Sequence, residues 1–124
     1  MSQPIKNAAE HIASLKDGRS VYLDGKKVDD VTTHPAFANA VQSAANLYEF
    51  QSRPENAEMM TFESPKTGRR VNRAWQMPTT YQELVTRRKA LVAWAEQSGG
   101  FMGRSPDHLA SAVTGQLMGL KMFE

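Results

Sequence analysis

The sequence predicts a mainly α-helical chain that carries short β-hairpins. In four stretches, apolar residues recur at the three- and four-residue spacing of a helix that has one buried face. Between these stretches, two pairs of strand-like segments flank a turn signal, Asp24-Gly25 in one pair and the segment from Ser64 to Gly68 in the other. At 124 residues the chain has the length of one domain.

The first two helices are predicted by their apolar spacing and by the residues at their ends. Residues 4–16 form a short amphipathic helix that closes at Asp17-Gly18. The second helix opens at Thr33-His34-Pro35 and stops before Pro54. The apolar positions are Ile5, Ala8, Ala9, Ile12 and Leu15 in the first helix, and Phe37, Val41, Ala44, Ala45 and either Leu47 or Tyr48 in the second.

Two histidines lie in these helices, and neither is assigned any chemistry. His34 precedes a proline at a helix entrance, where a histidine is most often a capping or surface residue. His11 lies within a surface-facing helix and is interpreted in the same way.

The last two helices are separated by a pair of glycines. Thr80 and Glu83 form a capping-box pattern that opens the third helix, which continues to Gly99-Gly100. The fourth helix opens at Pro106. The apolar stripe of the third helix is Leu84, Leu91, Trp94 and Ala95, with Arg87 or Arg88 between them, and the fourth runs through Leu109, Val113, Leu117 and Leu120.

Each predicted hairpin is too short to be stable without packing on other elements. Val21-Tyr22-Leu23 and Lys27-Val28 flank the first turn, while residues 59–62 and 70–75 flank the second.

Composition excludes several classes of function. Without cysteine, the chain has no disulfide, thiolate metal site or cysteine nucleophile, and no metal is expected. No apolar run approaches the ~20 residues that cross a bilayer, and the first residues lack the apolar core of a signal peptide, so we expect a soluble cytoplasmic protein. A net charge of +2 is too small to indicate nucleic acid as a partner.

Two basic clusters, residues 69–73 and 87–89, remain to be explained. Aromatic residues nearby would suit nucleic-acid stacking, but solvated faces or ion pairs are the more common outcome, and a subunit interface is a further alternative. The chain contains no phosphate loop, dinucleotide fingerprint, zinc-binding HExxH or nucleophile elbow.

The segment from Ser98 to His108 is the best candidate for a site. Gly99 and Gly100 suit the left-handed close of a helix, and Ser105 before Pro106 is an N-cap that opens the next helix. His108 then falls in a first turn whose free N–H groups favour an anion or phenolate. Arg104, four residues earlier, can converge with it on one ligand oxygen. On spacing alone, a solvated or paired arginine is the alternative.

Several ordered motifs give this chain a family resemblance from about Ala9 onward. The segment Gly-Gly-Phe-Met-Gly-Arg-Ser-Pro-Asp at 99–107 resembles the signature of the 4-hydroxyphenylacetate 3-hydroxylase family, the flavin-dependent oxygenase components of two-component aromatic monooxygenases. Earlier segments that match in order are Gly18-Arg19, residues 21–25, residues 30–37, Thr61-Phe62, Ser64-Pro65 and Thr67-Gly68.

The resemblance implies a fold, a cofactor and partners. Residues 1–124 would be the N-terminal helical domain of an acyl-CoA dehydrogenase-like fold, whose middle β domain, C-terminal helical bundle and flavin contacts lie beyond Glu124. In the family, a separate flavin reductase supplies reduced FAD, and a flavin C4a-hydroperoxide places oxygen ortho to a phenolic hydroxyl during aromatic compound catabolism. The full-length family implies a homotetramer.

The resemblance also implies roles for residues. Arg104 matches the substrate-gripping arginine and would stabilise the phenolate. His108 stands where members acting on 4-hydroxyphenylacetate have tyrosine, which points to a halogenated or otherwise substituted phenol. Arg104 and His108 are the expected catalytic residues, and Phe101 and Gly103 join them in binding substrate. The competing hypothesis is a truncated, non-catalytic helical domain that acts as an interaction module, and the 124-residue chain alone is expected to be inactive.

Overall fold

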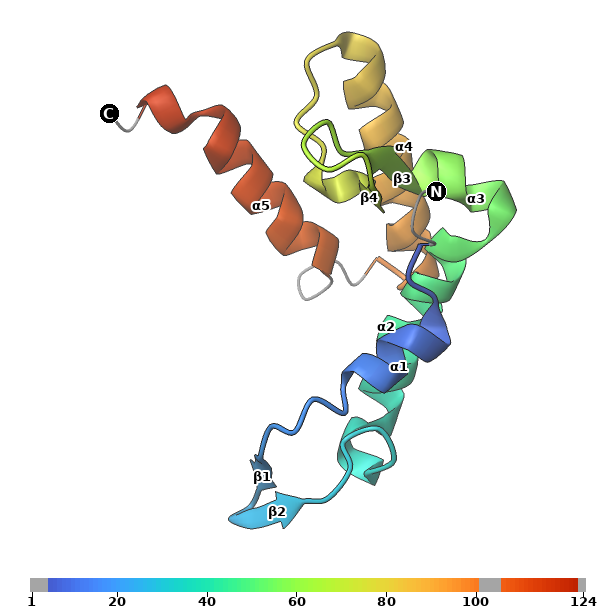
Figure 1. Cartoon of the computed structure of the whole chain (residues 1–124), viewed down its shortest axis with the longest axis vertical. Coiled ribbons are helices and arrows are strands. Elements are labelled where there is room, and N and C mark those ends of the chain that lie inside the picture. The colour runs from blue at the N-terminus through green and yellow to red at the C-terminus, as the bar shows by residue number, and fades with distance from the viewer. Residues whose placement is uncertain (1–4, 101–105, 123–124) are drawn as a thin grey trace. The chain divides into compact units, whose positions relative to one another are not determined.

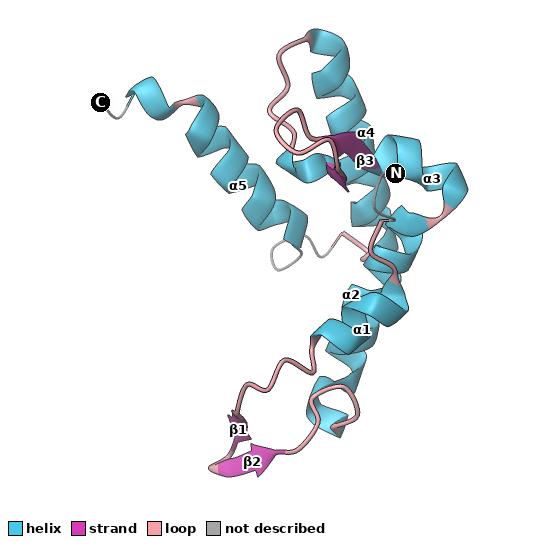
Figure 2. Ribbon diagram, viewed as in Figure 1, coloured by secondary structure: helices cyan, strands magenta, loops and turns pink. Residues whose placement is uncertain are grey.

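The computed structural model describes residues 5–100 and 106–122 as a mainly helical chain with two antiparallel hairpins (Figures 1 and 2). Internal contacts divide it into two compact units. The N-terminal unit is Lys6–Ser52, and the C-terminal unit takes in Ile5 and the described residues from Arg53 onward. Within these described ranges, every helix is too short or too polar to span a lipid bilayer.

Two helices, α1 (Ala8–Ser14) and α2 (Pro35–Ser52), form most of the N-terminal unit. The first is shorter than the predicted span of residues 4–16, because a capping box at Asn7 fixes its start. The Asn7 side-chain oxygen accepts from the Glu10 amide at 2.9 Å, and the Glu10 carboxylate accepts from the Asn7 amide at 3.0 Å. Both hydrogen bonds satisfy amides that a helix start leaves free.

The packing of α1 on α2 confirms part of the predicted apolar face. Ala45 is fully buried and Leu47 nearly so, and Tyr48 is half-buried beneath the ring of His11. The surface position expected for His11 is only partly correct: the residue is half-buried, because stacking on Tyr48 covers one face of its imidazole. His34 does cap α2, since its Nδ1 atom accepts from the Ala36 amide at 3.2 Å.

The first hairpin forms as predicted. Strand β1 (Val21–Leu23) pairs antiparallel with β2 (Lys26–Val28), and Val21 lies opposite Val28. Asp24 and Gly25 both have positive φ, 50° and 75°, which is the requirement of a type I′ turn. Of the six strand residues only Val28 is buried, so the hairpin contributes little core to this unit.

The second predicted hairpin is correct in its centre and wrong at both ends. Strand β3 (Thr61–Glu63) pairs with β4 (Arg70–Asn72). Residues 59–60 belong to a helix the sequence did not predict, α3 (Pro54–Met60), and Arg73–Trp75 is a 3-10 helix, η1. Pro54 explains the first difference: it ends α2 as expected, but it also occupies the first turn of α3, where proline is favoured.

The C-terminal unit is completed by α4 (Tyr81–Gln97), α5 (Pro106–Met118) and the short η3 (Leu120–Met122). The Thr80–Glu83 capping box opens α4 as predicted. Helices α3 and α4 contact each other, and η1 contacts both α4 and α5. The core of this unit is built from residues of α3, η1, α4 and α5, namely Met60, Ala74, Ala90, Trp94 and Ala110.

Candidate functional site

The predicted site begins at the end of α4, and its glycine closure is confirmed. Gly99 and Gly100 have φ values of 62° and 82°. The Gly100 amide donates to the Ala95 carbonyl at 2.7 Å, and the Gly99 amide donates to the Glu96 carbonyl at 3.3 Å. This pair of bonds is the Schellman motif, which satisfies carbonyls at a helix end and turns the chain away from the helix axis.

Helix α5 begins at Pro106 as predicted, which places His108 in its first turn. The His108 side chain is exposed. The other predicted site residues, Phe101, Gly103 and Arg104, and the Ser105 cap lie outside the described residues. The convergence of Arg104 and His108 therefore stays a prediction, and the structure describes the helices on either side of the segment 101–105.

Helix α5 packs through a face of small residues. Ala110 is 1% exposed and Thr114 is 2% exposed, and α5 contacts η1. The Thr114 hydroxyl donates to the Ala74 carbonyl of η1 at 3.4 Å. The larger apolar residues that marked this helix in the sequence, Leu109 and Leu117, are instead 65% and 54% exposed. Small side chains permit close approach to η1, which turns the leucines away from this contact.

Arg73 ties η1 to the end of α3. Its guanidinium donates to the backbone carbonyls of Glu58, Met59 and Thr61 at 2.5–2.7 Å and to the Gln76 side chain at 2.8 Å. The Glu58 and Met59 carbonyls belong to the last turn of α3, where a helix leaves carbonyls unpaired. Arg73 is only 7% exposed, and its burial lowers its pKa below the usual arginine value.

A second arginine connects α4 to both η1 and α5. The Arg87 Nη2 atom donates to the Ala74 carbonyl at 2.9 Å and to the Ser111 hydroxyl at 3.1 Å. Burial lowers the pKa of Arg87 as well. Among the described residues, its buried Nε atom and the buried Trp94 Nε1 atom have no hydrogen-bond partner.

These contacts correct the interpretation of the two basic clusters. Arg70 forms an ion pair with Glu58 at 2.6 Å, as expected for a basic cluster. Arg73 and Arg87, in contrast, are internal donors to neutral oxygens. Sequence reasoning missed them because arginine spacing does not reveal which guanidinium faces a helix end.

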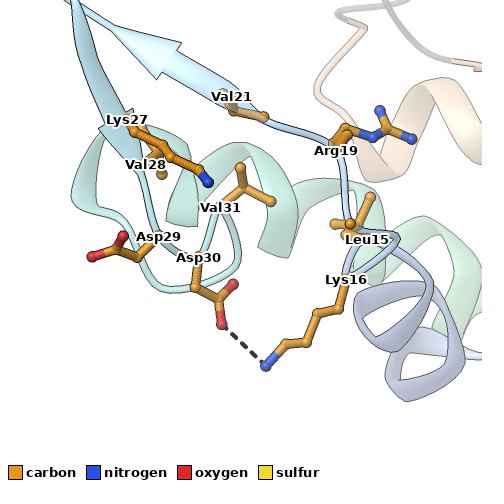
Figure 3. Close-up of a pocket in the computed structure, with 10 residues that line it drawn as sticks. Leu15, Lys16, Arg19, Val21, Lys27, Val28, Asp29, Asp30 and Val31 are labelled. Carbon is orange, nitrogen blue, oxygen red and sulfur yellow. Dashed lines mark ion pairs between the residues drawn. The ribbon is translucent and has the colours of Figure 1, made fainter.

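A separate hollow of about 330 Å³ lies within the N-terminal unit, between the end of α1 and the first hairpin (Figure 3). Leu15, Val21 and Val31 give it aliphatic walls. At its rim, Lys16 pairs with Asp30 at 3.0 Å. Hydrogen bonds from the hydroxyl and amide of Thr32, and then the ammonium of Lys16, lower the pKa of Asp30 to about 2. The hollow contains none of the predicted site residues.

Comparison with known proteins gives consistent matches. A model of the family described as 4-hydroxyphenylacetate 3-hydroxylase N terminal matches residues 7–124. The 4-hydroxyphenylacetate 3-monooxygenase oxygenase component of Geobacillus sp. (strain PA-9) is 47% identical over 114 residues, covering 91% of this chain and 23% of that protein. The 4-nitrophenol 2-monooxygenase oxygenase component of Rhodococcus sp. is 40% identical, covering 82% of this chain and 20% of that protein.

Solved structures agree with the expected fold. The oxygenase component of 4-hydroxyphenylacetate 3-monooxygenase complexed with FAD and 4-hydroxyphenylacetate matches with a TM-score of 0.82 and 36% identity, over 94% of this chain and 24% of that one. An archaeal 4-hydroxybutyryl-CoA dehydratase from N. maritimus matches with a TM-score of 0.62 and 27% identity, over 77% of this chain and 19% of that one. The N-terminal helical domain of an acyl-CoA dehydrogenase-like fold is thus confirmed, and the chain spans at most about a quarter of these proteins.

Proposed function

This chain belongs to the 4-hydroxyphenylacetate 3-hydroxylase family, and on that premise we propose that it forms the N-terminal part of the oxygenase component of a two-component flavin-dependent monooxygenase. Its substrate is a phenol, either 4-hydroxyphenylacetate or a related compound, which is hydroxylated ortho to its hydroxyl group. The observation that carries the proposal is the match over residues 7–124, because that range includes the whole candidate site. Since relatives are at least about four times longer, activity requires a longer protein.

The cofactor in this proposal is FAD, delivered in reduced form by a separate flavin reductase. When bound, it supplies activated oxygen, which amino-acid side chains cannot provide. His108, the predicted site residue that the structure describes, fits the substrate: an exposed imidazole on a helix's first turn is suited to a phenol oxygen. We assign the flavin contacts to the part of the longer protein that follows Glu124, and the homotetramer to that longer protein as well.

The chain's own residues bind the phenol and favour its ionised form. Arg104 donates guanidinium N–H groups to the phenolic oxygen and stabilises negative charge there. His108 accepts the phenolic proton at a ring nitrogen, which leaves a phenolate whose electron density is raised at the ortho carbon. Phe101 and Gly103 line the ring and help to exclude water.

A chimera tests this function directly. Residues 7–124 would replace the matching segment of the Geobacillus oxygenase component, and ortho-hydroxylation of a panel of phenols would be measured with FAD, reductase and NADH. We expect turnover. Arg104→Gln should lower kcat/KM by about 100-fold or more, the size of losing one donor to a developing oxyanion. Lys89→Gln on the exposed side of α4 is the matched control.

A second substitution addresses the substrate. If His108 selects a substituted phenol, His108→Tyr should shift the preference of the chimera toward 4-hydroxyphenylacetate. A chimera that folds and binds FAD, yet hydroxylates no phenol, would contradict the proposal and favour the non-catalytic interaction module. An unchanged kcat/KM in Arg104→Gln would remove Arg104 from the site.

A further inference from the structure

Arg87 connects three segments that are far apart in the sequence. It lies in α4, it donates to the Ala74 carbonyl of η1, and it donates to the Ser111 hydroxyl of α5. The Ala74 carbonyl also accepts a hydrogen bond from the Thr114 hydroxyl. It therefore receives one donor from α4 and another from α5. Within the described ranges, Arg87 is thus the side chain whose hydrogen bonds connect α4 to α5.

The environment of Arg87 makes these bonds important. Its acceptors are both neutral, its Nε atom is buried without a partner among the described residues, and burial lowers its pKa. A buried cation is unfavourable unless hydrogen bonds replace the water that it loses. Arg87 is half-buried, so loss of either acceptor leaves the covered part of its guanidinium with fewer partners, which favours the position of α5 that keeps both bonds.

The anchored residue lies one helical turn from the candidate site. Ser111 follows His108 by three residues, and such residues are neighbours on a helix surface. The segment that contains Arg104 joins the Schellman closure of α4 to the first turn of α5. Arg87 lies in the middle of α4 and Ser111 in the second turn of α5, so their hydrogen bond links the two helices that flank that segment.

We propose that Arg87 is a positioning residue for the phenol site. Through Ser111 it holds α5, and with it His108 one turn earlier, at a set place relative to α4. This inference rests on the proposed function and adds to it a residue whose effect passes through Ser111 and Ala74. Lysine can replace the charge but supplies one nitrogen, whereas methionine removes both hydrogen bonds at similar length.

Hydrogen exchange in the 124-residue chain tests the anchoring without any assay of function. Arg87→Met should accelerate exchange of the amides of residues 110–116 by about tenfold or more, as for loss of hydrogen bonds from a charged donor. Arg87→Lys should give a smaller increase. The amides of α1 and α2 serve as the internal control, and their exchange should not change.

Ser111→Ala keeps the test decisive if Arg87→Met unfolds the C-terminal unit. This substitution leaves Arg87 its bond to Ala74 and removes the direct bond to α5. It should accelerate exchange in α5 while leaving α4 protected. If the α5 amides exchange at the wild-type rate in both Ser111→Ala and Arg87→Met, the anchoring role is overturned.

Kinetics in the chimera then test the link to the site. Ser111→Ala and Arg87→Met should raise the KM for phenol by about tenfold with little change in kcat or in FAD affinity, and Arg87→Lys should restore part of the loss. If the parent chimera is active and these variants keep its KM, positioning is wrong and the proposed function stands. If the parent is inactive with every phenol, the proposed function fails and the assignment of Arg87 to a phenol site fails with it.

Discussion

At the scale of single residues, the contact between His11 and Tyr48 makes the N-terminal unit sensitive to acid. The two rings stack with centroids 4.3 Å apart, and the Lys6 ammonium lies 5.4 Å from the Tyr48 centroid. Burial, and then the charge of Lys6, lower the pKa of His11 below its usual 6.5. Its buried Nδ1 atom has no partner among the described residues, so nothing on that side stabilises a proton.

The direction of the pH effect follows from this lowered pKa. Unfolded His11 binds a proton at a higher pH than folded His11, so the unfolded state gains stability as pH falls below 6.5. The packing of α1 on α2 is therefore strongest above that value and weakens as pH falls toward the folded pKa. We predict that NMR titration of the His11 ring gives a pKa below 6.5.

A control separates the two causes of this shift. Lys6→Gln should raise the His11 pKa only part of the way to the usual value, because burial is the larger cause. His11→Phe should keep the stack and remove the loss of α1 protection in acid. A His11 ring that titrates at or above its usual value would contradict the burial seen here.

At the scale of elements, two glycines in the C-terminal unit differ in backbone conformation. Gly100 closes α4 with a φ of 82°, while Gly115 lies within α5 and has no positive φ. An added Cβ would meet no atom within 4 Å at either position. Steric clash is therefore absent from both, and any difference between them comes from backbone conformation.

Alanine substitution should consequently change stability in opposite directions. Gly100→Ala should destabilise by about 1–2 kcal/mol, because the left-handed conformation is unfavourable for residues with a Cβ. Gly115→Ala should stabilise by about 0.5–1 kcal/mol, because alanine loses less entropy in a helix interior. Urea unfolding of the two variants beside wild type measures both free energies, and effects of the same sign would refute the assignment.

At the scale of the whole molecule, the C-terminal unit exposes several large apolar side chains near its end. Leu117, Met118, Leu120 and Met122 are each more than half exposed, the last at 87%. They occupy the end of α5 and the η3 turn that follows. Large apolar side chains exposed close together in the sequence are typical of an interface.

We predict that the 124-residue chain self-associates at micromolar concentrations, which sedimentation would reveal as a mass above 13.8 kDa. Changing both Leu117 and Leu120 to lysine should favour the monomer. Changing Ala112 and Gln116 to lysine adds the same charge at exposed positions without large apolar side chains, and it should have less effect. A wild-type chain that remains monomeric throughout would contradict this prediction.

Much of the fold could be predicted from sequence, because helix ends carry local signals. The Thr80–Glu83 capping box, the Gly99-Gly100 closure and Pro106 each act within one turn, and each was placed correctly. Helix α3 was missed, because a proline that ends one helix can also begin the next.

The partners of long side chains could not be predicted in this way. Nothing local distinguishes Arg73, which is 7% exposed, from Arg69, which is exposed. The spacing of apolar residues also does not show that α5 packs through Ala110 and Thr114 while its leucines are exposed to solvent. Of the candidate site, the sequence predicted the helix that carries His108, while the network beneath it depends on contacts between distant residues.

The carbonyl of Ala74 has a consequence for how mutations are tolerated. It accepts hydrogen bonds from Arg87 and Thr114, so one main-chain oxygen receives donors from two helices. No codon specifies that oxygen, since every amino acid carries it. Genetic variation can therefore break the junction through its donors or by displacing the backbone, and the vulnerable codons are those of the donors, 13 and 40 residues downstream of the atom they share.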